Sequence, residues 1–306
     1  MDFLNIVEKY GYNTELANFL KQIYDELVEY LGDDKEAIIY EAFLNTEVVD
    51  CDNIYEYLNS EGYLDETEID DKSLKIATGI CFTKSDIIYD ENSKTFILNG
   101  IRRKVLVCNL KQNEDYINGA LIHELAHLAK NYYKSHEISG NLLIVREGFI
   151  KTVYELSYKN GKVCETLIEK EGIGLEEGLN SILEHDIAKK IVNPNYYVSG
   201  YNLVREIARI IPVNLGLKEA VLNAQVMKEK DAFVREFDLI FMDGAFKKFE
   251  SLLDRIYYLN LKQAAATGNM ELLMSITGEI DEVIKGELVQ LLDEMARARD
   301  AKKFVA

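Results

Sequence analysis

The chain of 306 residues has no tryptophan, only two prolines and only four histidines. It has four cysteines, and none of them belongs to a Cys-x-x-Cys pair. The sequence therefore argues against a zinc site built from thiolates and against a dense framework of disulfides, and we interpret the cysteines as free thiols.

Long apolar runs are also missing. No run approaches the roughly 18–20 apolar residues that a helix needs to cross a bilayer. The N-terminus, Met1-Asp2-Phe3-Leu4, has no basic region followed by a long apolar stretch, so we predict no secretory signal. The content of 48% hydrophobic and 10% aromatic residues is typical of a folded protein. We expect a cytoplasmic protein that does not bind membranes.

Basic residues are scarce, above all in the N-terminal quarter. The net charge is −18, and residues 1–75 contain 20 Asp or Glu against 5 Lys or Arg. Such a surface repels phosphate backbones, so we expect no nucleic-acid partner. We interpret the acidic segment as a solvated helical face that aids solubility. A second hypothesis is that these acidic helices cover an active-site cleft.

The spacing of apolar residues changes twice along the chain. Residues 4–60 show helical spacing, residues 76–108 form short β-rich runs, and the pattern is helical again from about residue 201. The sequence therefore predicts an α+β fold in three parts, which are a helical N-terminal segment (1–75), an α+β centre (76–200) and an all-helical C-terminal region (201–306).

Turn residues set the expected boundaries of the central elements. A turn is predicted at residues 90–93, and Asn99-Gly100 and Asn160-Gly161 each predict a tight hairpin turn. An acidic loop is expected at residues 61–71. Asn113 is expected to open a long helix.

Two of the four histidines lie four residues apart in that helix, in the sequence His123-Glu124-x-x-His127. Residues four apart share one face of a helix, so both imidazoles can bind a single Zn²⁺. Glu124 lies beside that face, where it can take a proton from a water on the metal. The segment predicts a zinc-dependent hydrolase.

A catalytic zinc needs a third protein ligand and an open position for water. A third histidine ten residues after the first is excluded because position 133 is Tyr. His136 has the wrong spacing, and we interpret it as a surface residue. Two carboxylates remain as alternatives. Glu147 lies in a β-rich run, whereas Glu177 lies at a helix start, next to Glu176, which could be mistaken for it.

The helical position of Glu177 makes it the preferred third ligand. Glu177, Asn180, Ser181 and Glu184 share one polar face of a helix whose other face is apolar. A polar stripe of this kind fits a surface that faces a metal, and its later residues are candidates for orienting the histidines.

At this point the chain resembles the gluzincin group of zinc metallopeptidases, in particular poorly characterised bacterial members. The resemblance covers roughly residues 76–200 and is strongest at 121–130 and 174–184, although the hairpin at Asn160-Gly161 lengthens the distance between the two motifs. It implies a zincin-like centre with a mixed β-sheet, an active-site helix and a second helix that carries the glutamate. An edge strand of that sheet would bind an extended peptide.

The resemblance also implies a role for each matching residue. His123, His127 and Glu177 would hold Zn²⁺, and Glu124 would act as the general base in hydrolysis of a peptide or protein substrate. A Tyr or His would stabilise the oxyanion, and we name Tyr201 as the candidate. Three other side chains are also within reach of this role: Tyr196, Tyr197 and His185.

Two alternatives to a general peptidase stay open. The first is a zinc-binding protein, non-catalytic or regulatory, that acts through protein–protein interaction. The second is a protease with one specific cellular target. The presence of Glu124 favours an enzyme, because loss of this residue is the usual mark of an inactive site.

Overall fold

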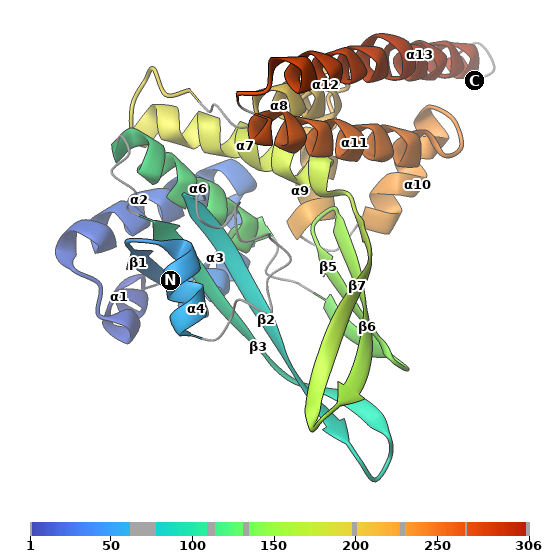
Figure 1. The fold of residues 1–306 in the computed structure, drawn as a ribbon. Helices are drawn as coiled ribbons and strands as arrows, with labels where there is room; N and C mark the ends of the chain where they lie inside the picture. The colour runs from blue at the N-terminus through green and yellow to red at the C-terminus, as the bar shows by residue number, and fades with distance from the viewer. Residues whose placement is uncertain are drawn as a thin grey trace. The chain divides into compact units, whose positions relative to one another are not determined.

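The computed structural model describes residues 2–61, 78–108, 114–130, 135–197, 201–226, 230–266 and 268–303. Most of the expected acidic loop at 61–71 and the expected helix cap Asn113 lie outside the described residues. The fold is α+β, as predicted, with a helical N-terminal part, mixed sheets with helices in the centre, and helices in the C-terminal region (Figure 1).

Contacts divide the chain into two compact units. The first consists of Met1–Val145, Tyr154–Thr166 and Asn180–Val198, and the second of Arg146–Val153, Leu167–Leu179 and Ser199–Ala306. Helix α7 (Ile173–Ile191) therefore contributes residues to both units. The division of the sequence at residues 75 and 200 stays a prediction.

The N-terminal helices follow the predicted apolar spacing. The Asn13 side chain caps the longest of them by accepting a hydrogen bond from the Leu16 N–H at 2.9 Å. Its apolar stripe includes Leu20, Ile23 and Leu27, which are all buried, as their i, i+3, i+4 spacing requires. The N-terminal elements are α1 (Leu4–Tyr10), α2 (Thr14–Leu31), the short 3₁₀ helix η1 (Asp33–Lys35), α3 (Glu36–Leu44) and α4 (Ile54–Ser60).

The expectation of helix throughout residues 4–60 is wrong at Glu47–Cys51, which form strand β1. This strand pairs in parallel with β3 (Thr95–Cys108), with Val48 opposite Val105. Both valines are buried. β-branched residues suit a pleated, buried surface, but only the partner strand, distant in sequence, makes a short run into a strand.

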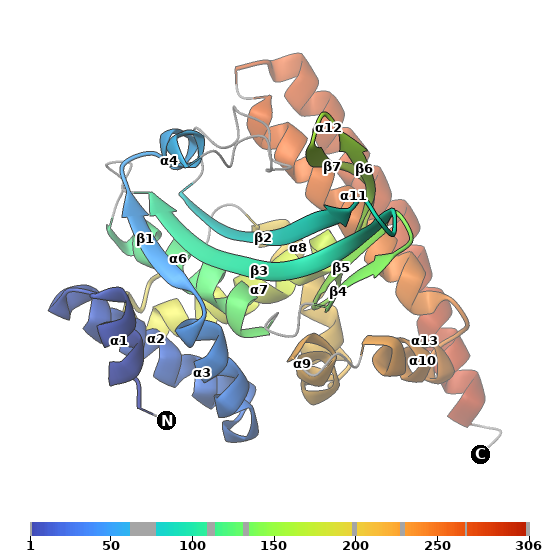
Figure 2. The ribbon, with the colours of Figure 1, turned by 90° about the horizontal axis from the view of Figure 1, so that it is seen from below.

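Strands β2 (Gly79–Asp90) and β3 form a long antiparallel hairpin, and the sheet order is β1-β3-β2 (Figure 2). The turn between them confirms the prediction at residues 90–93. The predicted turn at Asn99-Gly100 is wrong. Asp86 pairs with Gly100 and Ile87 with Leu98, so Asn99 is the extra residue of a β-bulge inside β3.

Helix α6 (Glu114–Lys130) carries the His-Glu-x-x-His segment and packs against β2, β3 and α3 (Figure 2). It is buried on several sides, with Leu121, Ile122, Leu125 and Leu128 each at most 4% exposed. A helix held on several sides gives its histidines a fixed backbone.

A second, four-stranded sheet has the order β4-β5-β6-β7. The predicted hairpin at Asn160-Gly161 is confirmed, and both residues have positive φ (52° and 78°), as a type I′ turn requires. The strands are β4 (Ser135–Ser139), β5 (Leu142–Glu147), β6 (Ile150–Lys159) and β7 (Lys162–Glu171).

All described elements of the second unit beyond residue 200 are helical, as predicted. Phe233, Phe237 and Phe246 form an aromatic core among them, together with Phe149 from the turn before β6. Among the described residues, no helix is long and apolar enough to span a membrane. The helices are α8 (Asn202–Ala208), η3 (Ile210–Asn214), α9 (Lys218–Val226), α10 (Lys230–Ile240), α11 (Ala245–Ala265), α12 (Met270–Glu282), η4 (Val283–Leu288) and α13 (Val289–Lys303).

Candidate metal centre

Helices α6 and α7 bring together the two histidines and one of the predicted carboxylates. One ligand atom from each of His123, His127 and Glu177 lies within 4.8 Å of the others. The Nε2 atoms of the two histidines are 3.2 Å apart. His123 is buried and Glu177 is partly buried. The three side chains are therefore a candidate metal site.

The spacing of these atoms fits a metal ion. Two nitrogens that each lie about 2.0–2.1 Å from one tetrahedral zinc are about 3.3 Å apart, which agrees with the observed 3.2 Å between the Nε2 atoms. Two histidines and one glutamate are the ligand set of one class of catalytic zinc sites. Imidazole also binds iron, copper and nickel, so the donor set alone does not fix the element.

Glu184 orients the first histidine. Its Oε2 accepts a hydrogen bond from His123 Nδ1 at 2.9 Å, and both side chains are buried. With the proton held on Nδ1, the lone pair of Nε2 faces His127 and is available to a metal. Of the three orienting residues that the sequence suggested, the structure gives this contact to Glu184.

The other two suggested residues make no such bond. Asn180 and Ser181 are fully buried on α7, and their side-chain polar atoms have no hydrogen-bond partner among the described residues.

Tyr196 completes this group from the segment after α7. Its hydroxyl donates to Glu184 Oε1 at 2.5 Å, and the tyrosine is only 6% exposed. The bond shows that this tyrosine orients Glu184. The ring of Tyr201 stacks on Tyr257 with centroids 6.0 Å apart, and its role at an oxyanion stays a prediction.

Tyr197 and His185 were the two other candidates for stabilising the oxyanion. Tyr197 is 65% exposed, and Nδ1 of His185 lies 3.5 Å from a carboxylate oxygen of Asp186.

Glu124, the predicted general base, lies beside the first residue of β2. A Cβ added at Gly79 would lie 3.1 Å from Glu124 Cγ and 3.6 Å from its Oε1. The glycine therefore leaves the Glu124 side chain room next to the edge of the sheet.

The neighbouring carboxylates have other roles. Glu176 is fully buried, accepts the Phe149 N–H at 3.0 Å and binds the Gln225 side chain at 2.9 Å. Glu176 is therefore not the residue that meets the histidines. Glu147 is the last residue of strand β5, in the strand that its surroundings predicted, and is not part of the metal-ligand group.

The first turn of α7 is held by a carboxylate from α11. Asp254 accepts the N–H groups of Gly172 at 2.8 Å and Gly174 at 2.7 Å. Burial raises the pKa of Asp254 to about 6, although these two hydrogen bonds act in the opposite direction. Gly172 has φ of +80°, and a Cβ at Gly174 would lie 2.3 Å from the Leu253 carbonyl oxygen. A Cβ at Gly172 would lie 2.1 Å from the Phe149 carbonyl oxygen, so each glycine is required where a second backbone approaches closely.

The interpretation of His136 as a surface residue is wrong. It is partly buried, and its Nδ1 is 2.6 Å from the Ser85 hydroxyl, a hydrogen bond that links β4 to β2. The sequence spacing between His136 and the His123/His127 pair correctly excluded it as a metal ligand. Sequence spacing does not, however, predict whether a side chain is buried.

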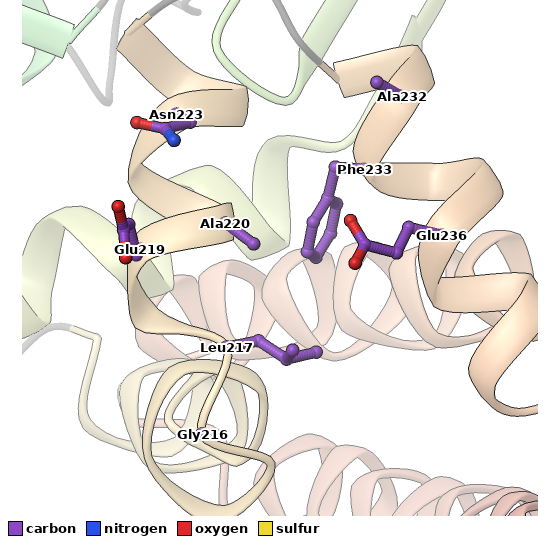
Figure 3. Close-up of a pocket in the computed structure, with 8 residues that line it drawn as sticks. All are labelled: Gly216, Leu217, Glu219, Ala220, Asn223, Ala232, Phe233 and Glu236. Atoms are coloured by element: carbon purple, nitrogen blue, oxygen red, sulfur yellow. The ribbon is translucent and has the colours of Figure 1, made fainter.

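A pocket of about 350 Å³ lies elsewhere, between α9 and α10 (Figure 3). Phe233 and Glu236 of α10 point toward α9 (Figure 3). None of its lining residues is a histidine or a cysteine, and none lies on α6 or α7, so the pocket is separate from the metal-ligand group. It is lined by Gly216, Leu217, Glu219, Ala220, Asn223, Ala232, Phe233 and Glu236.

Sequence reasoning did not identify two glycines of the site, Gly79 and Gly119. Gly119 lies inside α6, one turn before His123. A glycine inside a helix lowers helix stability, so its presence suggests that a neighbour needs the space. That signal was present in the sequence, but it does not say which neighbour.

Comparisons with models of known protein families, with curated protein sequences and with solved structures give no match. Function is therefore inferred from the geometry of the site.

Proposed function

We propose that this protein is a zinc-dependent peptidase of the gluzincin type. The observation that carries the proposal is the meeting of His123, His127 and Glu177 around one point, with Glu124 next to the first histidine on the same helix. This is the ligand set of a hydrolytic zinc centre together with a carboxylate that can move protons.

The protein groups divide the reaction between them. When bound, zinc would polarise the peptide carbonyl and acidify the attacking water. Glu124 takes the proton from that water as its oxygen bonds to the peptide carbon. As the carbon–nitrogen bond breaks, Glu124 passes the proton to the leaving amine. Glu184 keeps His123 in one tautomer throughout.

The position of β2 supports a peptide as substrate. Among the described strands, β2 pairs only with β3 and so has a free edge. It begins at Gly79, beside Glu124. An extended peptide that adds to this edge would pass the general base. The net charge of −18 also makes a nucleic-acid substrate a poor partner.

The metal is tested first, by elemental analysis of protein reconstituted with a mixture of zinc, iron, copper and nickel. We expect about one zinc per chain in the wild type, and a loss of most of it in Glu177→Ala. Glu147→Ala is the matched control, because it removes the rival carboxylate and should leave zinc bound. Zinc that is lost from Glu147→Ala and kept by Glu177→Ala would contradict the ligand set.

Catalysis is tested with Glu124→Gln, which keeps the shape of the side chain. This variant should bind zinc like the wild type and cleave a mixed peptide library roughly 10²–10⁴-fold more slowly. Equal rates for both proteins would rule out Glu124 as general base. Stoichiometric zinc with no cleavage by the wild type would instead favour a non-catalytic metal protein.

A further inference from the structure

We infer that Tyr196, Glu184 and Gly119 form a positioning unit that holds His123 in its metal-binding tautomer and orientation. The inference deepens the proposed function and rests on its metal site. It assigns to Tyr196 a role distinct from oxyanion stabilisation, because the tyrosine acts through Glu184 on a ligand.

The turn after α7 places Tyr196. The Tyr196 N–H donates to the Asn193 carbonyl at 2.8 Å, and the Asn195 N–H donates to the Asn193 side-chain oxygen at 2.9 Å. The Asn193 amide in turn donates to Asp115 at 2.6 Å, in the first turn of α6. The segment that follows α7 is thereby fastened to the start of the helix that bears the histidines.

Gly119 provides the space for the tyrosine. A Cβ at this position would lie 1.8 Å from the Tyr196 hydroxyl oxygen and 2.4 Å from Cζ. The backbone of Gly119 is ordinary helix without positive φ, so glycine is needed here for space and not for conformation. Residues 119 and 123 are one turn apart on the same face of α6. The tyrosine ring therefore lies against α6 one turn N-terminal to His123.

Among the residues that the structure describes, each oxygen of Glu184 has one partner. Oε1 accepts the Tyr196 hydroxyl and Oε2 accepts His123 Nδ1, while the Glu184 side chain is only 5% exposed. A buried carboxylate that loses one of its two donors has an unsatisfied oxygen, and one contact no longer fixes its position. Removing the tyrosine hydroxyl would therefore loosen the bond that fixes the His123 ring.

The first test is Tyr196→Phe, measured as zinc affinity by competition with a chromophoric chelator. Loss of a residue that orients a ligand typically weakens metal binding by about 10- to 100-fold, and we expect a loss in that range. Tyr158→Phe is the matched control. It removes a tyrosine hydroxyl that also donates to a carboxylate, Glu91 at 3.2 Å. This pair joins β6 to the turn between β2 and β3 and includes no residue of α6 or α7, so the variant should bind zinc like the wild type.

A second readout does not need metal. In the metal-free protein, ¹⁵N NMR of the imidazole should show His123 as the Nδ1–H tautomer in the wild type and in Tyr158→Phe. A mixture of tautomers is expected in Tyr196→Phe. Circular dichroism establishes that each variant is folded.

Gly119→Ala tests the space for the ring, and Gly278→Ala is its matched control, because Gly278 lies in helix α12 with nothing within 4 Å of an added Cβ. The first should weaken zinc binding, whereas the second should stabilise its helix and leave zinc affinity unchanged. The double variant Gly119→Ala/Tyr196→Phe should lose less zinc affinity than the product of the two single fold-losses. The reason is that both changes act through Glu184.

The outcomes separate this inference from the proposed peptidase. Wild-type zinc affinity and a single His123 tautomer in Tyr196→Phe would overturn the positioning unit, even if peptides are cleaved. A wild type that binds no metal would overturn it as well. Weakened zinc binding in Tyr196→Phe without any peptide cleavage by the wild type would uphold the positioning unit and reject the peptidase.

Discussion

Two adjacent glutamates on α7 make different contacts because they lie on different faces of the helix. Glu176 is fully buried and holds the Phe149 N–H and the Gln225 amide, whereas Glu177 joins the two histidines. Neighbours along a helix point about 100° apart, so two residues of the same chemistry face different surroundings. One carboxylate fixes the helix, and the other is a candidate ligand.

These different surroundings predict that Glu176→Ala lowers stability and keeps zinc, whereas Glu177→Ala loses zinc. Glu176→Ala leaves the Phe149 N–H and the Gln225 amide without their acceptor, and each buried unsatisfied group costs about 1–3 kcal/mol. We expect urea denaturation to show a loss of about 2–4 kcal/mol in unfolding free energy, with zinc retained by the folded fraction. Unchanged stability together with loss of zinc would instead make Glu176 the ligand.

At the scale of an element, α7 is fixed by partners distant in sequence. Its start lies in a glycine-rich turn whose N–H groups bind Asp254 of α11. The helix dipole and these two donors favour the ionised carboxylate, but burial outweighs them and raises the pKa of Asp254 to about 6. Glu250 and Lys230 also face this carboxylate and act on its pKa in opposite directions.

This raised pKa predicts how stability depends on pH. The folded state holds the Asp254 proton more tightly than the unfolded chain does, so its contribution is fully present below about pH 4 and is lost as the pH rises through about 6. The loss is of the order of 2–3 kcal/mol. Asp254→Asn cannot ionise, so its unfolding free energy relative to the wild type should increase between pH 4 and pH 7. A constant difference over this range, measured by urea titration of the metal-free protein, would contradict the raised pKa.

The β2–β3 hairpin shows the limit of local turn signals. Asn-Gly occurs at 99–100 and at 160–161, but only the second pair forms a turn. Near the first pair the chain has already reversed at residues 91–94. Asn99 is accommodated as a bulge within a strand that pairs with β2 before and after it, and with β1 from Lys104 to Cys108. Pairing along a long strand outweighs the preference of two residues.

At the scale of the whole molecule, the acidic N-terminal segment is part of the first unit and its sheet. β1 pairs with β3, and α3 packs against α6. Leu20, Ile23 and Phe43 of this segment are at most 3% exposed. The segment therefore contributes core as well as charge.

Removal of residues 1–72 tests this role. The truncated chain loses a strand and exposes the apolar side chains of β3 and α6, so we expect it not to fold cooperatively. Circular dichroism and thermal denaturation should show no cooperative transition for the first unit. A truncated protein that melts like the wild type and cleaves peptides faster would instead support the hypothesis that the acidic helices only cover a cleft.

The sequence by itself determined what depends on local periodicity. Helical spacing was sufficient to place His123 and His127 on one face and to group Glu177 with Glu184. Asn160 and Gly161, two residue types that tolerate positive φ, were sufficient to predict the hairpin turn. Tertiary structure decided which carboxylate meets the histidines, that Tyr196 binds Glu184, and that residues 47–51 form a strand. The physical reason is that these features depend on contacts between segments far apart in the chain, whose energies outweigh local preferences.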